Sequence, residues 1–390
     1  MKILFAHTPP DLYGASKSLM RLTSRLVKDG NEIHVILNDK GELGEELIKN
    51  GIKVIIHKKL IYIGRDKLKK PFSFLLLLLN LPSSVYQLMK IIKRISPDII
   101  HTNTALIISP AIAAYISRKS HIWHIRETFT EFGSLWKVYR GILSFLSSKI
   151  IAVSKPVADQ FISEVTNKKI IVLNNGFPAA EFTPVDSVRI IKFKNDFKLN
   201  GKLLVGVIGR IKFGRKGQDV FVKAVSLIKD KYPNVQFIII GSPFPGNEDH
   251  LTMLKKMIIE LNLKNNITLT GDVVDIKAAI SALDISVLPS ALPEPFGGVV
   301  IESMAFGKPV IGTNIGGTID QIIDGKSGFL VNPNDSNVLA EAMEKLIINE
   351  NLRLEMGNKG RELFLSKFEF EKYYEKIKLI YGSIEGRVNS

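Results

Sequence analysis

The chain has 390 residues, of which 45% are hydrophobic and 23% are charged, so we expect a globular protein of two or so domains and not a disordered or fibrous one. The absence of cysteine excludes disulfides and thiolate metal sites and fits the cytoplasm, a reducing compartment. Residues 1–200 carry 30 Lys and Arg against 16 Asp and Glu, net +14, whereas residues 201–390 carry 23 against 22, net +1.

This one-sided charge indicates a polyanionic partner or an anionic membrane. The alternative is that scattered lysines serve only solubility. The opening segment, Met1–His7, has too short an apolar run for a secretory signal, so we expect the protein to stay inside the cell.

The first 60 residues alternate between short apolar strands and amphipathic helices. Strands are expected at 2–7, 33–37 and 54–57, with helices at 17–27 and 43–50. Such alternation predicts a doubly wound α/β domain with a parallel sheet. The first loop holds only Gly14 and lacks the G-x-G-x-x-G of dinucleotide-binding proteins, so a nicotinamide enzyme is not expected.

Residues 58–95 combine many basic residues with the apolar run Leu75–Leu79 and an amphipathic helix at 85–95. The apolar run is interrupted by Pro82 and is far shorter than the ~20 residues that cross a bilayer. Its basic flanks suit anionic lipid headgroups, each basic residue contributing roughly 1 kcal/mol near such a surface. Residues 132–148, with Phe132, Leu135, Trp136, Lys137, Tyr139 and Arg140, form a second candidate. Either segment could instead cover the protein core.

Two strands of the first half end in polar loops that contain His101 and His124. Side chains at the carboxyl ends of parallel strands gather at one edge of the sheet. His124 lies beside Arg126 and Glu127, which favours a functional role, whereas for His101 a structural role is equally open. Further strands are expected at 150–154 and 170–173.

The second half repeats the alternation, with strands at 203–208, 236–240, 267–269, 285–288 and 309–311. Arg210 follows the first of these strands, and Lys216 precedes a helix that begins near residue 220. The pair Asp272 and Asp275 is spaced one residue too wide for a D-x-D metal motif.

Glu294 and Glu302 stand eight positions apart around Pro295-Phe296-Gly297-Gly298. Glu294 is in a turn after a strand and Glu302 is in the following helix, so both carboxylates can address one site from the helix N-terminus. Gly297 and Gly298 leave backbone N–H groups uncovered, and such groups attract anions and hydroxyls. The alternative is an ordinary helix start with Glu302 solvated at the surface.

The E-x7-E pattern with its internal Pro-Phe-Gly resembles the signature of the retaining glycosyltransferases of the GT-B fold, the large group-4 family with nucleotide-sugar donors. The resemblance covers nearly the whole chain and includes further residues in family order. These are Gly14, His124, Asn175-Gly176, Arg210 and Lys216. Many relatives carry two glycines where this chain has Tyr13 and Gly14.

The resemblance implies two doubly wound Rossmann-like domains that face a central cleft, with a C-terminal helix that crosses back to the first domain. The implied boundaries are an acceptor-side and membrane-facing domain at 1–185, a linker at 186–200, a donor domain at 201–366 and the returning helix at 367–390.

The resemblance also implies roles at the site. Arg210 and Lys216 would hold the donor diphosphate, and Glu302 would hold the ribose hydroxyls. Glu294 and the backbone of Phe296, Gly297 and Gly298 would hold the sugar. His124 would lie near the donor sugar and Gly14 near the phosphates; the resulting candidates for catalysis are Glu294, His124, Arg210 and Lys216. Neither a metal nor a cofactor is expected, because cations would neutralise the leaving diphosphate.

The expected activity is retaining transfer of a hexose-type sugar from a UDP or GDP donor to a glycan or lipid-linked acceptor, in cell-surface polysaccharide or glycolipid assembly. The expected location is the cytoplasm, with peripheral attachment to the inner face of an anionic membrane and without a nucleic-acid partner. Two alternatives remain open: a nucleotide-sugar epimerase or hydrolase on the same fold, and a non-catalytic membrane-binding scaffold.

Overall fold

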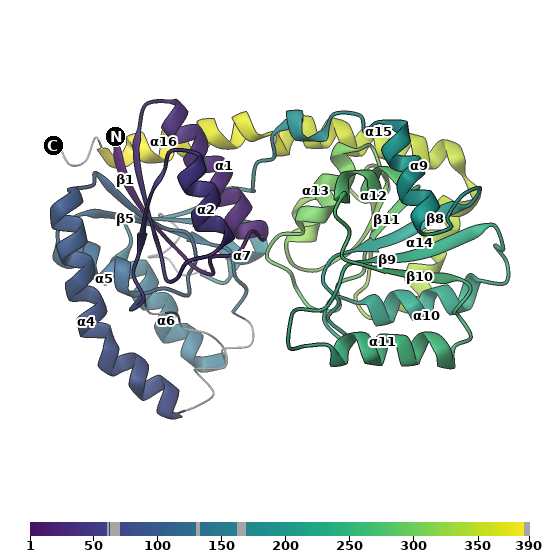
Figure 1. Cartoon of the computed structure of the whole chain (residues 1–390), viewed down its shortest axis with the longest axis horizontal. Coiled ribbons are helices and arrows are strands. Elements are labelled where there is room, and N and C mark those ends of the chain that lie inside the picture. Colours follow the sequence, from purple (N-terminus) through teal and green to yellow (C-terminus); the bar gives the residue numbers. More distant parts are fainter. Residues whose placement is uncertain (61, 63–70, 130–132, 162–168, 386–390) are drawn as a thin grey trace. The chain divides into compact units, whose positions relative to one another are not determined.

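The structure is a computed structural model that describes residues 1–60, 62, 71–129, 133–161 and 169–385. The chain forms two compact units (Figure 1). Unit 1 comprises Met1–Asn175 together with the chain from Tyr373 onward, and unit 2 comprises Gly176–Lys372.

Unit 1 is built around a parallel sheet whose described strands have the order β3-β2-β1-β4-β5-β6-β7. The strands are β1 (Lys2–His7), β2 (Glu32–Leu37), β3 (Lys53–Ile56), β4 (Ile99–Thr102), β5 (Ser120–Ile125), β6 (Lys149–Ala152) and β7 (Ile170–Val172). The helices are α1 (Gly14–Lys28), α2 (Glu42–Lys49), α4 (Pro71–Ile95), α5 (Ser109–Ile116), α6 (Gly133–Leu146) and α7 (Lys155–Asp159). The central strands are apolar along nearly their whole length and buried, as expected for a parallel sheet covered on both faces.

Unit 2 has a second parallel sheet, with the order β10-β9-β8-β11-β12-β13 among its described residues. The strands are β8 (Leu203–Ile208), β9 (Val235–Ile240), β10 (Ile267–Gly271), β11 (Ile285–Leu288), β12 (Val310–Thr313) and β13 (Gly328–Val331). The helices are η2 (Ala179–Phe182), α9 (Ser187–Asp196), α10 (Gln218–Ile228), α11 (Asp249–Glu260), α12 (Ile276–Ala282), α13 (Gly298–Ala305), η3 (Gly316–Asp320), α14 (Ser336–Ile348), α15 (Glu350–Leu363) and η4 (Phe364–Phe368). The expected α/β class with two doubly wound sheets is therefore confirmed.

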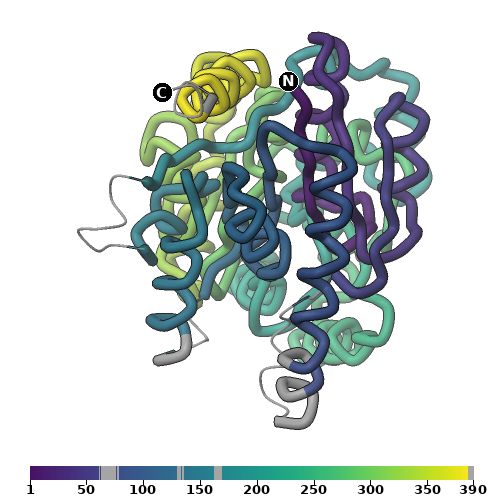
Figure 2. Tube along the Cα trace, turned by 90° about the vertical axis from the view of Figure 1, so that its left-hand side faces the viewer, coloured from purple at the N-terminus to yellow at the C-terminus, as the bar shows by residue number. Residues whose placement is uncertain are grey.

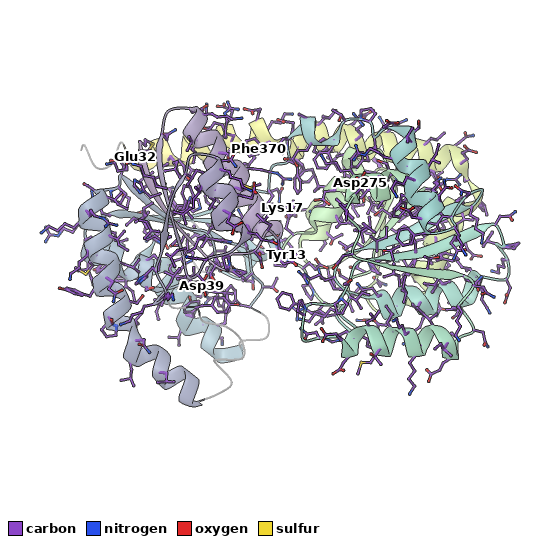
Figure 3. The ribbon with its side chains drawn as sticks, in the orientation of Figure 1. Tyr13, Lys17, Glu32, Asp39, Asp275 and Phe370 are labelled. Carbon is purple, nitrogen blue, oxygen red and sulfur yellow. The ribbon has the colours of Figure 1, made fainter. Side chains whose placement is uncertain are left out.

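Residues 186–200, which the sequence indicates as a linker, contain helix α9 and belong to unit 2. The charges of this segment hide an apolar face, since Phe193 and Leu199 are buried in a cluster with residues of β8 and α12. Arg189 of α9 also donates two hydrogen bonds, of 2.7 and 2.8 Å, to the carboxylate of Asp275, which caps α12 (Figure 3). The chain instead passes between the units at Asn175 and Gly176.

The helix expected at 85–95 begins earlier in the structure, because α4 runs from Pro71 through Pro82 to Ile95 as one helix, seen as the long blue helix of Figure 2. A proline inside a helix removes one hydrogen bond and costs about 3 kcal/mol. Tertiary burial offsets that cost, since Val85, Leu88 and Ile92 pack into the core beneath the sheet of unit 1. The C-terminal half of α4 thus covers the core, while Leu79 is 68% exposed.

The last helix, α16 (Phe370–Glu385), packs on unit 1 as expected. The Tyr374 hydroxyl donates a 2.7 Å hydrogen bond to Asp29 at the end of α1, and the Tyr381 hydroxyl lies 2.8 Å from Nδ1 of His101 at the end of β4. Within the described ranges, no helix is long and apolar enough to cross a bilayer.

Candidate functional site

Each sheet has a point where the strand order reverses, and ligands of doubly wound folds bind beyond the carboxyl ends of the strands at that point. In unit 2 it lies between the neighbouring strands β8 and β11. The loop after β8 carries Arg210 and Lys216, and the loop after β11 carries Glu294. Candidate residues from two distant stretches of sequence therefore lie on either side of the point where the strand order of unit 2 reverses.

Lys216 and Glu294 form an ion pair, with 2.7 Å between Nζ and Oε2. The other carboxylate oxygen of Glu294 accepts a hydrogen bond from the Ser290 hydroxyl. The side chains of Lys216 and Glu294 are 32% and 15% exposed, so the pair is accessible but partly desolvated. The sequence provides each residue as a candidate, but their pairing appears only in the structure.

Glycines allow the loops around this pair to approach closely. Gly217 has φ +73°, and a Cβ there would lie 1.7 Å from the Pro289 carbonyl oxygen, so the backbone after Lys216 packs directly on the end of β11. Gly316 and Gly317 of η3 pack on the Glu294 loop in the same way, and the Gly317 N–H donates a 2.7 Å hydrogen bond to the Glu294 carbonyl. A side chain at any of these glycines would displace the loop that holds Glu294.

Arg210 lies directly after Gly209 at the end of β8, with its guanidinium 4.7 Å from the centroid of the Phe244 ring. The buried side chain of Gln218 donates a 2.9 Å hydrogen bond to the Arg210 carbonyl. Gln218 is the first residue of α10, so the Arg210 backbone is fixed to the helix that follows Lys216.

The N-terminus of α13 has the backbone arrangement that an anion or a hydroxyl can use. Gly297 is the N-cap and contributes no side-chain hydrogen bond, which leaves the positive end of the helix dipole without a side-chain cap. Gln321 fixes this turn by donating a 3.1 Å hydrogen bond to the Gly297 carbonyl. Gly298 begins the helix, and Glu302 is half-buried one turn further along.

The ring of Phe296 serves packing, since it stacks on Phe177 at 6.3 Å and meets Phe368 edge-on at 6.3 Å. This packing anchors the turn whose backbone is the candidate sugar-binding element. Phe296 can therefore contribute to a site through its main chain while its half-buried side chain packs against the core.

In unit 1 the reversal lies between β1 and β4, and polar side chains meet at that edge. Asn103 donates a 3.2 Å hydrogen bond to Nδ1 of His7, so Nε2 of His7 donates to the Ser16 hydroxyl at 3.0 Å. Ser16 in turn donates to Asp11 at 3.2 Å. Burial first, and then the charge of nearby Arg126, lower the pKa of His7 to about 3, although a hydrogen bond with Asn103 acts in the opposite direction, so His7 is neutral at pH 7.

Arg126 organises the same edge from its buried position after β5. Its guanidinium donates to Asn103 at 3.0 Å, to the Ser18 hydroxyl at 3.1 Å and to Asn175 at 2.5 Å. Asn175 is the last residue of unit 1 before the chain enters unit 2, and Tyr373, where the chain returns, also interacts with Arg126. Arg126 therefore links the central strands of unit 1 to the two places where the chain leaves and re-enters this unit.

His124 is fully buried at the end of β5. Its Nδ1 lies 3.4 Å from the Arg126 guanidinium, and its Nε2 has no hydrogen-bond partner among the residues that the structure describes. Burial first, then the charge of Arg126, lower the pKa of His124 well below its usual value. A neutral imidazole with one unused nitrogen can accept or donate a single hydrogen bond, depending on its tautomer.

His101 is also fully buried and sits 5.5 Å from the ring of His124, with Nδ1 bound to Tyr381. This contact gives His101 a structural role in anchoring α16. Gly14 begins α1 at the surface, and a Cβ there would meet nothing within 4 Å. The fold of unit 1 therefore does not require glycine at position 14.

Sequence reasoning missed the residues whose hydrogen bonds hold the candidate side chains and loops in place at the two sheet edges. They are Ser290, Gln218, Ser18 and Asn103, together with Arg126, whose several hydrogen bonds were not foreseen. Asn103, Arg126 and Ser290 had a signal, since each follows a predicted strand end. Gln218 and Ser18 are ordinary polar residues without such a signal. Among the described residues, no group of three or more His, Asp or Glu could hold a metal ion.

Two family models match the chain. The model described as glycosyl transferases group 1 matches residues 188–363, and the model described as glycosyltransferase family 4 matches residues 13–181. The sequence is 30% identical over 385 residues to an uncharacterized glycosyltransferase, MJ1178, of Methanocaldococcus jannaschii, with 96% of each chain covered. It is 28% identical over 282 residues to the capsular polysaccharide biosynthesis glycosyltransferase CapM of Staphylococcus aureus, with 70% of this chain and 73% of CapM covered.

Among solved structures, Anabaena HepE in complex with UDP superposes with a TM-score of 0.82 at 23% identity and covers 98% of this chain and 100% of HepE. The sucrose-phosphate synthase of Thermosynechococcus elongatus superposes with a TM-score of 0.80 at 20% identity, with 99% of each chain covered. Similarity at these identities concerns the fold.

Proposed function

The chain belongs to the glycosyl transferases group 1 family and has the GT-B fold, and we propose that this glycosyltransferase moves a hexose-type sugar, with retention, from a nucleotide-diphosphate donor. The proposed acceptor is a hydroxyl of a glycan or lipid-linked glycan in cell-surface polysaccharide or glycolipid assembly. The name of the relative CapM supports assembly of a surface polysaccharide.

The observation that carries this proposal is the convergence of Lys216, Arg210 and Glu294 at the strand-order reversal of unit 2. A sugar nucleotide loses a diphosphate, and developing negative charge at that leaving group is stabilised by cations already in position. Lys216 is held in position by Glu294 at 2.7 Å. Arg210 follows the adjacent strand β8, and we assign the diphosphate to these two cations.

The remaining residues around the reversal have roles that fit a sugar and a ribose. Glu294, with the backbone of Phe296, Gly297 and Gly298, contacts the sugar hydroxyls, and Glu302 contacts the ribose hydroxyls. In the proposed reaction the bond from the anomeric carbon to the diphosphate breaks, and the acceptor oxygen bonds to the same face of the sugar. The departing diphosphate takes up the acceptor proton, and in this scheme the acceptor oxygen attacks the sugar directly, without a protein nucleophile.

From unit 1 we assign His124 to the donor sugar and Gly14 to the surroundings of the phosphates. The unpartnered Nε2 of His124 supports a hydrogen bond to a substrate hydroxyl. The open space beside Gly14 supports close approach of a ligand to the backbone.

The nature of the nucleotide is tested by comparing UDP-sugars and GDP-sugars. HepE is described in complexes with UDP and UDP-glucose, so UDP-glucose is the first donor to test. We propose that catalysis needs no metal, and the activity should then survive dialysis against EDTA; loss of activity that Mg²⁺ or Mn²⁺ restores would contradict this.

The function is tested in two steps. A screen of nucleotide sugars for thermal stabilisation identifies the donor, since a ligand that binds only the folded state raises the unfolding temperature. The hit is then incubated with lipid-linked and free glycan acceptors. Release of nucleoside diphosphate only with acceptor supports transfer, release without acceptor indicates a hydrolase, an epimerised sugar nucleotide indicates an epimerase, and binding without turnover indicates a scaffold.

We also propose that the enzyme attaches peripherally to the inner, anionic face of a membrane, because its first 200 residues carry the net charge of +14. The sequence indicated residues 58–95 and 132–148, of which 61, 63–70 and 132 lie outside the described residues. Trp136 of the second segment stacks on Phe129 at 4.0 Å and faces the interior. Sedimentation with anionic vesicles that weakens at higher salt supports attachment, and equal binding to neutral vesicles contradicts it.

A further inference from the structure

A pocket of about 750 Å³ lies at the amino-terminal edge of the sheet of unit 1, the edge that faces the viewer in Figure 2. The candidate site of unit 1 is at the opposite, carboxyl-terminal edge. The starts of β5 and β6 and the ends of α5 and α6 form its walls, and Ile384 of α16 completes them. The lining residues of interest are Tyr115, Arg118, Lys119, Phe145, Lys149 and Lys169.

The pocket is strongly basic, since four lining residues are Lys or Arg and its described lining contains no Asp or Glu. Lys169 is already used, because its ammonium donates 3.0 Å hydrogen bonds to the carbonyls of Ser144 and Ser147 at the end of α6. Arg118, Lys119 and Lys149 form no ion pair within the part of the chain that the structure describes.

Cations near helix C-termini often serve only to balance the helix dipole. Lys169 does so for α6. The end of α5 is closed by its own backbone, since the N–H groups of Arg118 and Lys119 bond the carbonyls of Tyr115 and Ala114 at 3.1 and 2.9 Å. The side chains of Arg118, Lys119 and Lys149 are therefore not needed to cap these helices, and together they can bind an anion.

An exposed apolar stripe leads along α6 to the mouth of this pocket. Val138, Ile142 and Phe145 are 66%, 38% and 66% exposed and stand at i, i+4 and i+7, on one face of the helix. Tyr115 and Ile116 of α5 continue it, at 56% and 51% exposure, with the Tyr115 ring 5.2 Å from that of Phe145. An exposed apolar face that borders unpaired cations is typical of a membrane-interface element.

We propose that the basic pocket binds the phosphate headgroup of an anionic phospholipid while the apolar stripe on α6 and α5 enters the adjacent acyl region. Charge complementarity selects the phosphate, and the apolar rim selects a lipid over free inorganic phosphate. This inference rests on the proposed membrane attachment and assigns it to residues other than Trp136 and Tyr139, which face inward.

The test uses the full chain with two charge variants of matched design. Arg118 has φ +53°, a conformation that favours glycine, so Arg118→Gly with Lys149→Gln removes two charges without straining the backbone. The control is Lys198→Gly with Lys223→Gln in unit 2, because Lys198 has φ +56° and both lysines are exposed. Phe145→Gln tests the stripe, and Leu379→Gln, at a residue 74% exposed on α16, is its control.

Binding is measured by sedimentation with vesicles of 30% phosphatidylglycerol in phosphatidylcholine. The pocket variant should bind roughly 30-fold more weakly than the control, from about 1 kcal/mol per basic residue and a factor of ten per 1.36 kcal/mol. Phe145→Gln should weaken binding more than Leu379→Gln does. Soluble dihexanoyl phosphatidylglycerol below its micelle concentration should bind the wild type and not the pocket variant, and inorganic phosphate should compete only weakly.

Equal vesicle binding by the pocket variant and its control overturns the headgroup site while leaving membrane attachment standing. Absence of vesicle binding by the wild type overturns both. Inorganic phosphate that binds as tightly as the short-chain lipid also overturns the proposal, because it indicates a site for a free anion. Transfer to a soluble acceptor should be equal in the pocket variant and the wild type, so a failure of the transferase proposal is detected separately.

Discussion

The Lys216–Glu294 ion pair makes a specific prediction for a double-mutant cycle. Lys216→Ala removes a cation assigned to the leaving diphosphate, and loss of one such preorganised group lowers turnover 10²- to 10³-fold, or about 3 to 4 kcal/mol. Glu294→Gln removes the carboxylate that holds the Lys216 ammonium at 2.7 Å and leaves an oxygen that can still accept from Ser290. It should reduce both donor binding and turnover, because it affects the sugar and the position of Lys216.

Because the two side chains touch, their effects should not add. Residues in direct contact show coupling energies of about 0.5 to 3 kcal/mol, and a pair that is only 15% and 32% exposed belongs toward the middle of that range. We expect the double variant to lose at least ~1 kcal/mol less than the sum of the single losses, a factor of about five in kcat/KM.

The assay is steady-state kinetics with each variant, beside calorimetric titration of the nucleoside diphosphate and a thermal melt. Lys216→Ala should melt near the wild type, since a partly exposed ion pair contributes about 1 kcal/mol or less to stability. Additivity within ~0.5 kcal/mol would show that the ion pair has no part in catalysis. Near-normal turnover of a folded Lys216→Ala variant would show that the diphosphate lies elsewhere.

Three further predictions concern Glu302, His124 and the two buried histidines His7 and His121. Glu302→Gln should mainly raise the KM for the donor in steady-state kinetics, since ribose contacts are similar in the ground and transition states; a fall in kcat alone would contradict this. His124→Ala should leave calorimetric binding of the nucleoside diphosphate intact and impair transfer, and lost diphosphate binding in a folded variant would refute that role. Burial lowers the pKa of His7 and of His121 to about 3, whereas in the unfolded chain the same histidines take up protons below pH ~6.5. The free energy of unfolding, measured by urea titration, should therefore fall by ~2 kcal/mol per histidine from pH 7 to pH 5. An unchanged free energy of unfolding would refute this prediction.

The sequence predicts the strands well because each is a short apolar run bounded by turn residues. It predicts β1 at Lys2–His7 and β11 at Ile285–Leu288 as the structure has them. It fails at α9, where local charge indicates a linker, and at α4, where a helix is expected only from residue 85 although the structure has it from Pro71. In both places burial of apolar side chains decides the outcome, and burial depends on partners that are distant in sequence.

The candidate site was predicted residue by residue but not as an arrangement. Glu294 and Lys216 are 78 positions apart, and nothing in either local pattern shows that they pair. Arg126 was noted only as a neighbour of His124, because its contacts with Ser18, Asn103 and Asn175 arise from the order of strands in the sheet. A pattern of residue types indicates which side chains can bind or react with a ligand, whereas the order of strands in the sheet determines which of those side chains lie together in one site.

The central claim is retaining transfer from a nucleotide sugar, and the configuration of the product tests it most directly. The donor identified by thermal stabilisation is incubated with an acceptor, and the anomeric proton of the purified product is measured by NMR. We predict the anomeric configuration of the donor, together with one nucleoside diphosphate released per sugar transferred. A product of inverted configuration, or sugar released to water with none on the acceptor, would contradict the account.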